Sequence, residues 1–116
     1  MTPDGVKVTI LVDNRAGEGL LSEHGLSVWI EADGKRILFD TGQGVLDFNT
    51  RVLGVDLAET DILVLSHGHY DHTGGIPMVL RKARSVEIFF HPGATHSRYA
   101  IRDGKAKAIG MPPSSR

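Results

Sequence analysis

The sequence predicts an α/β fold in which helices pack on one mixed β-sheet, and three observations support that prediction. Segments rich in β-branched residues alternate with segments whose apolar residues recur at helical spacing. A short, wholly apolar run at 62–65 is typical of a central strand covered on both faces. The dipeptide Asp33-Gly34 is the favoured turn of a two-residue hairpin. A chain of 116 residues has room for one core, so a single domain over 1–116 is expected.

The first part of the chain is expected to form strands. Residues 6–12 are β-branched and are bounded by turn-forming residues, which predicts a first strand. Residues 26–32 and 35–40 flank the predicted turn, so they are expected to pair in antiparallel fashion. Trp29 and Phe39 are expected to pack on the buried face of this pair.

Helices and strands are expected to alternate after the hairpin. Residues 45–53 carry apolar side chains at helical spacing and are followed by Gly54, which predicts a short helix. A second helix is predicted at 76–83, between strands at 62–65 and 86–90. Whatever follows the strand at 62–65 would lie at the carboxyl end of a central strand, where open α/β sheets bind their ligands.

Three imidazoles and one carboxylate occur within residues 67–72. Residues two apart in an extended segment project to the same side, so His67 and His69 are placed to bind one cation. Asp71 and His72 lie just beyond, where the chain must turn, and are placed to reach a second cation. These side chains are ligands of zinc, manganese or iron. A solvated polar loop is the alternative, but crowded groups without a metal would lose solvation without gaining partners. The segment therefore predicts a site for up to two divalent ions, with zinc preferred.

Composition narrows the classes of partner. The 13 Lys and Arg residues against 14 Asp and Glu residues give a formal net charge of −1. No basic stripe indicates nucleic-acid binding, and no apolar run approaches the length of a membrane span. The chain contains no cysteine, which excludes disulfides, thiolate ligands and a cysteine nucleophile. The start of the sequence lacks a secretory pattern, so a cytoplasmic protein is expected.

The metal segment has the form His-x-His-x-Asp-His (HxHxDH), follows an apolar strand and precedes Thr73-Gly74-Gly75. In this it resembles the signature of the metallo-β-lactamase-fold hydrolases. Five further segments are similar to one branch of that superfamily, which includes metal-dependent hydrolases and dihydropterin-methyl-ribofuranosylaminobenzene phosphate synthases: 23–27, 39–42, 91–93, 98–99 and 109–112. The resemblance extends over nearly the whole chain. It implies a metallo-β-lactamase-like half-sandwich, because family members are markedly longer and the similarity aligns with their first half.

The resemblance also implies roles for particular residues. A metal-bound hydroxide would attack a phosphoester or a similar anionic metabolite, and Asp71 would be catalytic by orienting that hydroxide as well as binding metal. Asp40 is expected to orient a ligand histidine rather than to bind metal directly, with a turn-capping role as the alternative. His24, His91 and Arg98 are weaker candidates for substrate contact, and an exposed position is the plainer account of each.

The ligand count leaves the state of the chain open. Two catalytic zinc sites need about six or seven protein ligands, and the motif supplies four. The chain is expected to be a piece of a longer hydrolase, one half of a split enzyme, or an inactive module that binds one metal loosely. A half-fold would expose a sheet face or edge, so a homo-oligomer or a complementing second half is the expected partner, beside a small anionic metabolite. A pterin-branch synthase and a non-catalytic metal-binding or subunit module remain the alternative functions.

Overall fold

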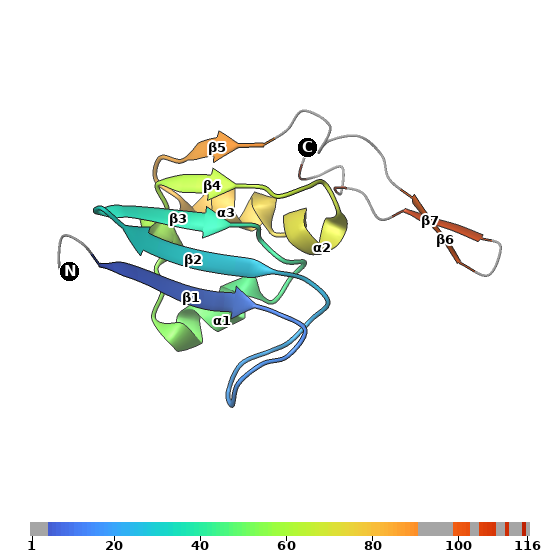
Figure 1. Cartoon of the computed structure of the whole chain (residues 1–116), viewed down its shortest axis with the longest axis horizontal. Helices are drawn as coiled ribbons and strands as arrows, with labels where there is room; N and C mark the ends of the chain where they lie inside the picture. Colours follow the sequence, from blue (N-terminus) through green and yellow to red (C-terminus); the bar gives the residue numbers. More distant parts are fainter. Residues whose placement is uncertain (1–4, 91–98, 103–104, 109–110, 112–114, 116) are drawn as a thin grey trace.

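A computed structural model of the chain describes residues 5–90, 99–102, 105–108, 111 and 115. Its main sheet has five strands in the order β1-β2-β3-β4-β5 (Figure 1). The strands are β1 (Val6–Val12), β2 (Ser27–Ala32), β3 (Lys35–Phe39), β4 (Ile62–Val64) and β5 (Glu87–Phe89). The first three pair in antiparallel fashion, whereas β4 is parallel to both β3 and β5. The predicted α/β fold with a mixed sheet is confirmed, and each predicted strand is found within two residues of its expected bounds.

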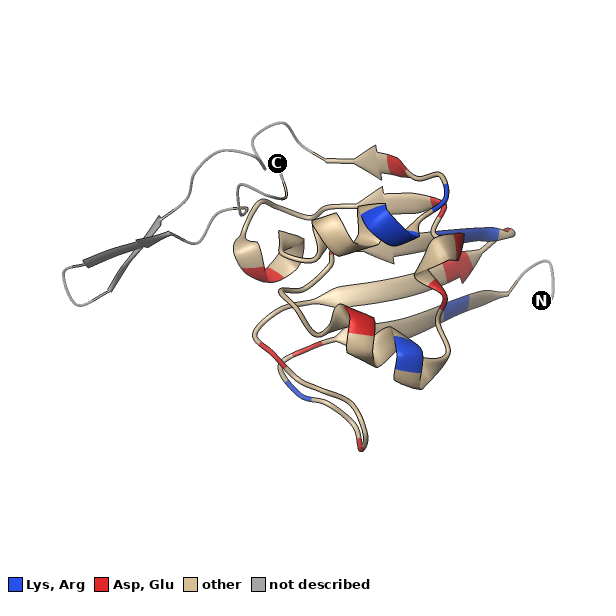
Figure 2. Cartoon of the chain, turned by 180° about the vertical axis from the view of Figure 1, so that it is seen from behind, with Lys and Arg blue, Asp and Glu red and all other residues tan. Residues whose placement is uncertain are grey.

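The helices are α1 (Leu46–Leu53), the short 3₁₀ helix η1 (Leu57–Glu59), α2 (Tyr70–Thr73) and α3 (Ile76–Lys82). Figures 1 and 2, which view the chain from opposite sides, show that α1 and α3 lie on the same face of the sheet. The sequence predicted α1 and α3 but not α2, which occupies the turn expected after the metal segment. Two further strands, β6 (Tyr99–Arg102) and β7 (Lys105–Ala108), form a separate antiparallel pair that the sequence did not predict. Within the described ranges, no helix has both the length and the apolarity needed to cross a membrane.

The hairpin between β2 and β3 forms as predicted. Asp33 and Gly34 both have positive φ, 50° and 73°, as a two-residue turn of the type favoured in hairpins requires. The register places Trp29 opposite Leu38 on the helix side, where both are buried. The prediction that Phe39 shares this buried face is wrong, because Phe39 is the next residue after Leu38 and therefore points to the other side of the sheet.

The core lies between the sheet and the helices. Leu38 and Leu63 come from the sheet, Leu46 from α1, and Ile76 and Val79 from α3. The opposite face of β4 is different, because Ile62 and Val64 are only half-buried and no described helix lies over them. The expectation that this strand is covered on both faces is therefore wrong for the part of the chain that the structure describes.

The core makes a direct prediction about stability. Leu63 has no exposed surface, so Leu63→Ala is expected to lower the free energy of unfolding by about 2–5 kcal/mol through lost burial and the cavity left behind. Val52 on α1 is 50% exposed, so Val52→Ala should change the free energy of unfolding by less than about 0.5 kcal/mol. Urea denaturation at equal protein concentration compares the two variants. Equal effects would show that Leu63 is not part of a packed core.

Candidate metal centre

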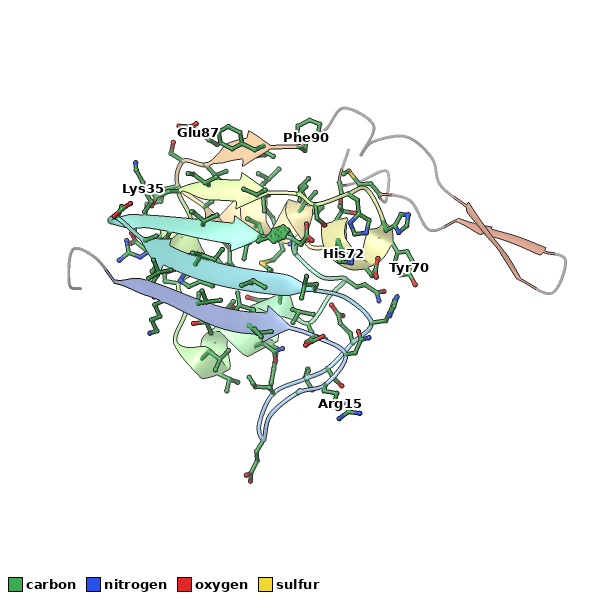
Figure 3. All side chains as sticks on the ribbon, in the orientation of Figure 1. Arg15, Lys35, Tyr70, His72, Glu87 and Phe90 are labelled. Atoms are coloured by element: carbon green, nitrogen blue, oxygen red, sulfur yellow. The ribbon has the colours of Figure 1, made fainter. Side chains whose placement is uncertain are left out.

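The metal segment leaves the sheet at the carboxyl end of β4, as the sequence predicted, and the end of β3 lies beside it (Figure 3). Residues 67–69 form an irregular stretch, and His69 is the capping residue that precedes α2. The ring of His67 lies centrally, with its centroid 4.7 Å from that of His69 and 4.1 Å from that of His72. The fold therefore gathers the three imidazoles into one cluster.

Two overlapping groups of side chains in this cluster have the composition of a metal site. In each group, one ligand atom per residue lies within 4.8 Å of the others. The first group is His67, His69 and Asp71; the second is Asp40, His67 and His72. Imidazole nitrogens and carboxylate oxygens suit zinc and the similar divalent ions, so the residues present fit the metal that the sequence predicts.

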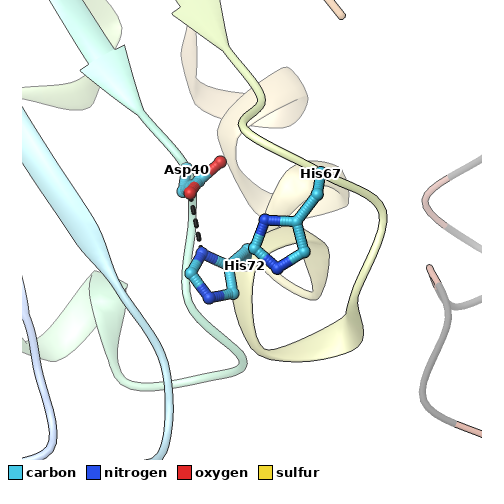
Figure 4. Close-up of side chains that lie close together, drawn as sticks. All are labelled: Asp40, His67 and His72. Carbon is cyan, nitrogen blue, oxygen red and sulfur yellow. Dashed lines mark hydrogen bonds and ion pairs between the residues drawn. The ribbon is translucent and has the colours of Figure 1, made fainter. Parts of the chain in front are cut away.

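Asp40 anchors the second group from the end of β3 (Figure 4). Its side chain is fully buried, and its Oδ1 accepts the Ser66 backbone N–H at 2.8 Å. Its Oδ2 accepts the Ser66 hydroxyl at 2.6 Å and lies 2.7 Å from Nδ1 of His72. Because a carboxylate oxygen only accepts, Nδ1 of His72 is the donor of this hydrogen bond, which leaves Nε2 as the atom available to a metal ion. Both oxygens of Asp40 thus have protein partners already, which favours an orienting role over direct metal binding.

Ser66 connects this network to the next imidazole. Its Oγ lies 2.7 Å from Nδ1 of His67 as well as within hydrogen-bond distance of Asp40. Burial, followed by the neighbouring charges of His72 and His69, lowers the pKa of His67 below its ordinary value. The neutral ring is the form that binds metal, so this environment favours a ligand.

Asp71 is the buried carboxylate of the first group, 8% exposed. Its Oδ2 lies 3.1 Å from Nε2 of His24 and 3.5 Å from Nε2 of His72. His24 comes from the loop before β2 and its side chain is 68% exposed, so it stands at the rim of the cluster. The structure thus brings one of the three weaker candidates to the site. His91 and Arg98 lie outside the described residues.

Several supporting contacts involve residues that the sequence did not single out for the site. The Thr41 backbone N–H donates to the His72 carbonyl at 2.7 Å, and the Thr41 hydroxyl accepts the Gly75 N–H at 2.9 Å. These bonds tie the end of β3 to α2 and to the start of α3. The nearest sequence signal is that Thr41 follows Asp40 in the Asp-Thr-Gly segment.

Glu23 holds the turn between β3 and α1. Its carboxylate accepts the backbone N–H of Gln43 at 2.6 Å and of Gly44 at 3.0 Å. Glycines before a helix either present their N–H groups to a phosphate or simply allow a strand-to-helix turn. The N–H groups of Gln43 and Gly44 have an internal carboxylate as their acceptor, which favours the plain turn.

A glycine provides a test of how closely the loop before β2 packs on the metal segment. A Cβ built on Gly25 would lie 2.5 Å from the Asp71 carbonyl oxygen, closer than real Cβ contacts. Gly25→Ala is therefore expected to shift Asp71 and to destabilise the fold by about 1–3 kcal/mol. Gly44→Ala is the matched control, because a Cβ there meets nothing within 4 Å. Thermal unfolding and zinc titration of both variants would test this; equal behaviour would contradict the close packing at Gly25.

Comparisons with known proteins give a consistent result. The family model of the Metallo-beta-lactamase superfamily matches residues 23–115. Over 99 residues the chain is 37% identical to 7,8-dihydropterin-6-methyl-4-(beta-D-ribofuranosyl)-aminobenzene-5'-phosphate synthase of Methanocaldococcus jannaschii, a match that covers 77% of this chain. It is 35% identical over 80 residues to a metal-dependent hydrolase of Shouchella clausii, a match that covers 66% of this chain. Each match covers 33% of the relative, so the chain spans about a third of the length of these proteins.

The fold is also similar to that of solved structures. A metal-dependent hydrolase of the beta-lactamase superfamily superposes with a TM-score of 0.56 at 22% identity, over 92% of this chain and 58% of the other. A metallo-beta-lactamase of Cronobacter sakazakii superposes with a TM-score of 0.54 at 26% identity, over 76% of this chain and 34% of the other.

Proposed function

The chain belongs to the metallo-beta-lactamase superfamily, and on that premise we propose that it provides the metal centre of a hydrolase acting on a phosphoester or a similar anionic metabolite. The observation that supports this most strongly is the convergence of His67, His69 and Asp71 within 4.8 Å at the carboxyl end of β4. A relative at 35% identity is itself named a metal-dependent hydrolase.

In this proposal each residue has a distinct role. His67, His69, Asp71 and His72 hold up to two divalent ions, zinc being the preferred one. When bound, such an ion lowers the pKa of water and polarises a substrate oxygen. Asp71 also orients the attacking water, since its Oδ2 lies within the cluster. Asp40 fixes the tautomer of His72 through Nδ1.

The remaining ligands are proposed to come from a second half. Two catalytic zinc sites need about six or seven protein ligands, against the four proposed here. The chain covers a third of the length of its relatives, so we propose that the missing ligands come from the rest of a longer protein, from a complementing polypeptide or from a second copy of the chain. His24, at the rim and largely exposed, is placed to meet the anionic group of the substrate.

Metal analysis combined with an assay tests the proposal. The purified protein is loaded with zinc or manganese, analysed for bound metal and assayed on chromogenic phosphate mono- and diesters. At least one metal per chain is expected, and metal-dependent hydrolysis is expected once the source of the remaining ligands is present. Hydrolysis should be lost in Asp71→Asn and kept in Asp47→Asn, since Asp47 lies on α1 and pairs with Lys82. Substoichiometric metal without hydrolysis in excess metal would favour a non-catalytic metal-binding or subunit module.

A pterin-branch synthase is the second candidate function, and the 37% identity to the methanogen synthase favours it. The discriminating measurement is equilibrium binding of a reduced pterin, followed by pterin fluorescence, in the metal-loaded protein. Saturable pterin binding would support this candidate. Ester hydrolysis without pterin binding would leave the hydrolase proposal in place and exclude the synthase.

A further inference from the structure

The backbone that leads from the loop after β1 into β2, here called the rim segment (residues 23–26), carries the imidazole of His24 to the metal cluster. The His24 side chain is 68% exposed, yet its Nε2 lies 3.1 Å from Oδ2 of Asp71. A contact between an exposed imidazole and a carboxylate contributes little free energy of its own, because solvent competes for both partners. The position of this imidazole therefore depends on how the rim segment itself is held.

Hydrogen bonds join the rim segment to two other parts of the chain. The Leu26 N–H donates to the Asp71 carbonyl at 3.3 Å, and the Leu26 carbonyl accepts the Gly42 N–H at 3.0 Å. The His24 carbonyl accepts Nε2 of the Gln43 side chain at 2.5 Å. Two of these three bonds end on the turn between β3 and α1 (residues 42–44), so a displacement of that turn displaces His24 as well.

The carboxylate of Glu23 lies inside the turn at 42–44. Besides accepting the N–H groups of Gln43 and Gly44, its Oε2 stands where a Cβ on Gly42 would be only 2.7 Å away. Gly42 also has a φ of 65°, which favours glycine. Hydrogen bonds from N–H groups to a charged carboxylate are about twice as strong as those between neutral groups. The turn is thus shaped around this carboxylate, and its conformation depends on Glu23.

We propose that Glu23 is a positioning residue that acts on the metal centre through His24. Its carboxylate holds the 42–44 turn, the turn holds the rim segment, and the rim segment holds the imidazole beside Asp71. Contact of His24 with the anionic group of a substrate rests on the proposed function. The link from Glu23 to His24 does not, because every bond in it joins residues of the metal-free chain.

Nuclear magnetic resonance of the metal-free protein tests this link without any reaction. At about pH 9 an ordinary imidazole is neutral, so protonation does not contribute to the ring resonances. Asp71→Asn is expected to shift the ring resonances of His24, because the two side chains are in contact. In the Glu23→Ala background, the same substitution should shift them by less than half as much. An equal shift with and without the Glu23 carboxylate would overturn the proposal.

Two further variants make this comparison specific. Glu23→Gln keeps the size of the side chain and one acceptor oxygen, so the shift in its background should be intermediate, and this variant decides the question if Glu23→Ala does not fold. Glu18→Ala is the matched control, because Glu18 is an exposed carboxylate of the same loop. It should leave the full shift at His24. A loss in Glu18→Ala equal to that in Glu23→Ala would contradict a specific role for Glu23.

A double-mutant cycle tests whether the link serves the proposed site. The probe is inorganic phosphate, whose binding to zinc-loaded protein freed of excess zinc is measured by calorimetry. His24→Ala is expected to weaken phosphate binding about fivefold, the usual effect of losing one hydrogen bond. Glu23→Ala should weaken it to a similar degree. The double variant should stay within about twofold of His24→Ala, because both changes remove the same interaction.

The outcomes of the cycle separate the two proposals. Additive losses in the double variant would contradict positioning through His24. Absence of phosphate binding in the unchanged protein would count against the proposed function, and the resonance shifts of His24 would then decide the link from Glu23 by themselves.

Discussion

Replacing His69 with alanine is expected to abolish retention of a divalent ion by the purified protein. His69 belongs to the group in which the ligand atoms of His67, His69 and Asp71 lie within 4.8 Å of one another. Two ligands from that group do not hold a zinc ion against water, since structural and catalytic zinc sites use at least three protein ligands. Elemental analysis after dialysis, together with zinc titration by calorimetry, measures the effect.

His24→Ala is the matched control for that experiment. Its imidazole also contacts the cluster, 3.1 Å from Asp71, but belongs to neither candidate ligand group. We expect this variant to keep its metal through dialysis. Unchanged metal content in His69→Ala would rule out the site, and equal loss in both variants would show that contact with Asp71, rather than ligation, decides retention.

Asp40→Asn is expected to lower metal affinity by about 10–100-fold, the usual effect of losing the carboxylate that orients a ligand histidine. The asparagine amide keeps the size of the side chain and tolerates the left-handed backbone at this position, where φ is 57°. The substitution removes the negative charge that fixes the His72 tautomer. An amide accepts hydrogen bonds only at its oxygen, so one of the two Ser66 groups that donate to Asp40 loses its acceptor. Competition with a chromogenic zinc chelator measures the affinity.

Asp61→Asn controls for the general effect of removing an acidic group near the sheet. The Asp61 carboxylate accepts the Arg36 backbone N–H at 2.8 Å, at the amino ends of β3 and β4, away from the cluster. The Asp61→Asn variant should bind metal with an affinity within about twofold of that of the unchanged protein. A group outside the site affects the metal only through screened, long-range charge. A similar loss in both variants would contradict the orienting role of Asp40.

The elements that the sequence predicted well are those whose signals are local. The β-branched run at 6–12, the Asp33-Gly34 turn and the Gly54 helix end are each signals within a few residues, and the structure has all three elements. Phe39 was assigned to the wrong face because the period of a strand gives two faces, and only the register with Trp29 tells which one is buried. The α2 turn is too short for a periodic signal.

The same distinction between local and long-range signals applies to the site. The ligand cluster is contiguous in sequence, so residue type and spacing were enough to predict it. The orienting role of Asp40 was expected from the family resemblance, but residue type and spacing did not identify its partners, because Ser66 lies 26 and His72 32 residues away. The Glu23 bonds to the β3–α1 turn span 20 or 21 residues, and nothing in the sequence near Glu23 indicates its partner. Such contacts follow from the topology of the sheet.

The contiguity of the cluster also affects what happens when the chain unfolds. The four proposed ligands lie within residues 67–72, so a denatured chain keeps them as close neighbours and can chelate the same ion. A ligand that binds both states raises the melting temperature by less than its affinity for the native protein implies. Contacts from distant segments distinguish the two states at this site, above all the Asp40 carboxylate on Nδ1 of His72 and the Thr41 backbone N–H on the His72 carbonyl. The thermal shift produced by zinc would therefore measure the contribution of those two partners more than that of the histidines.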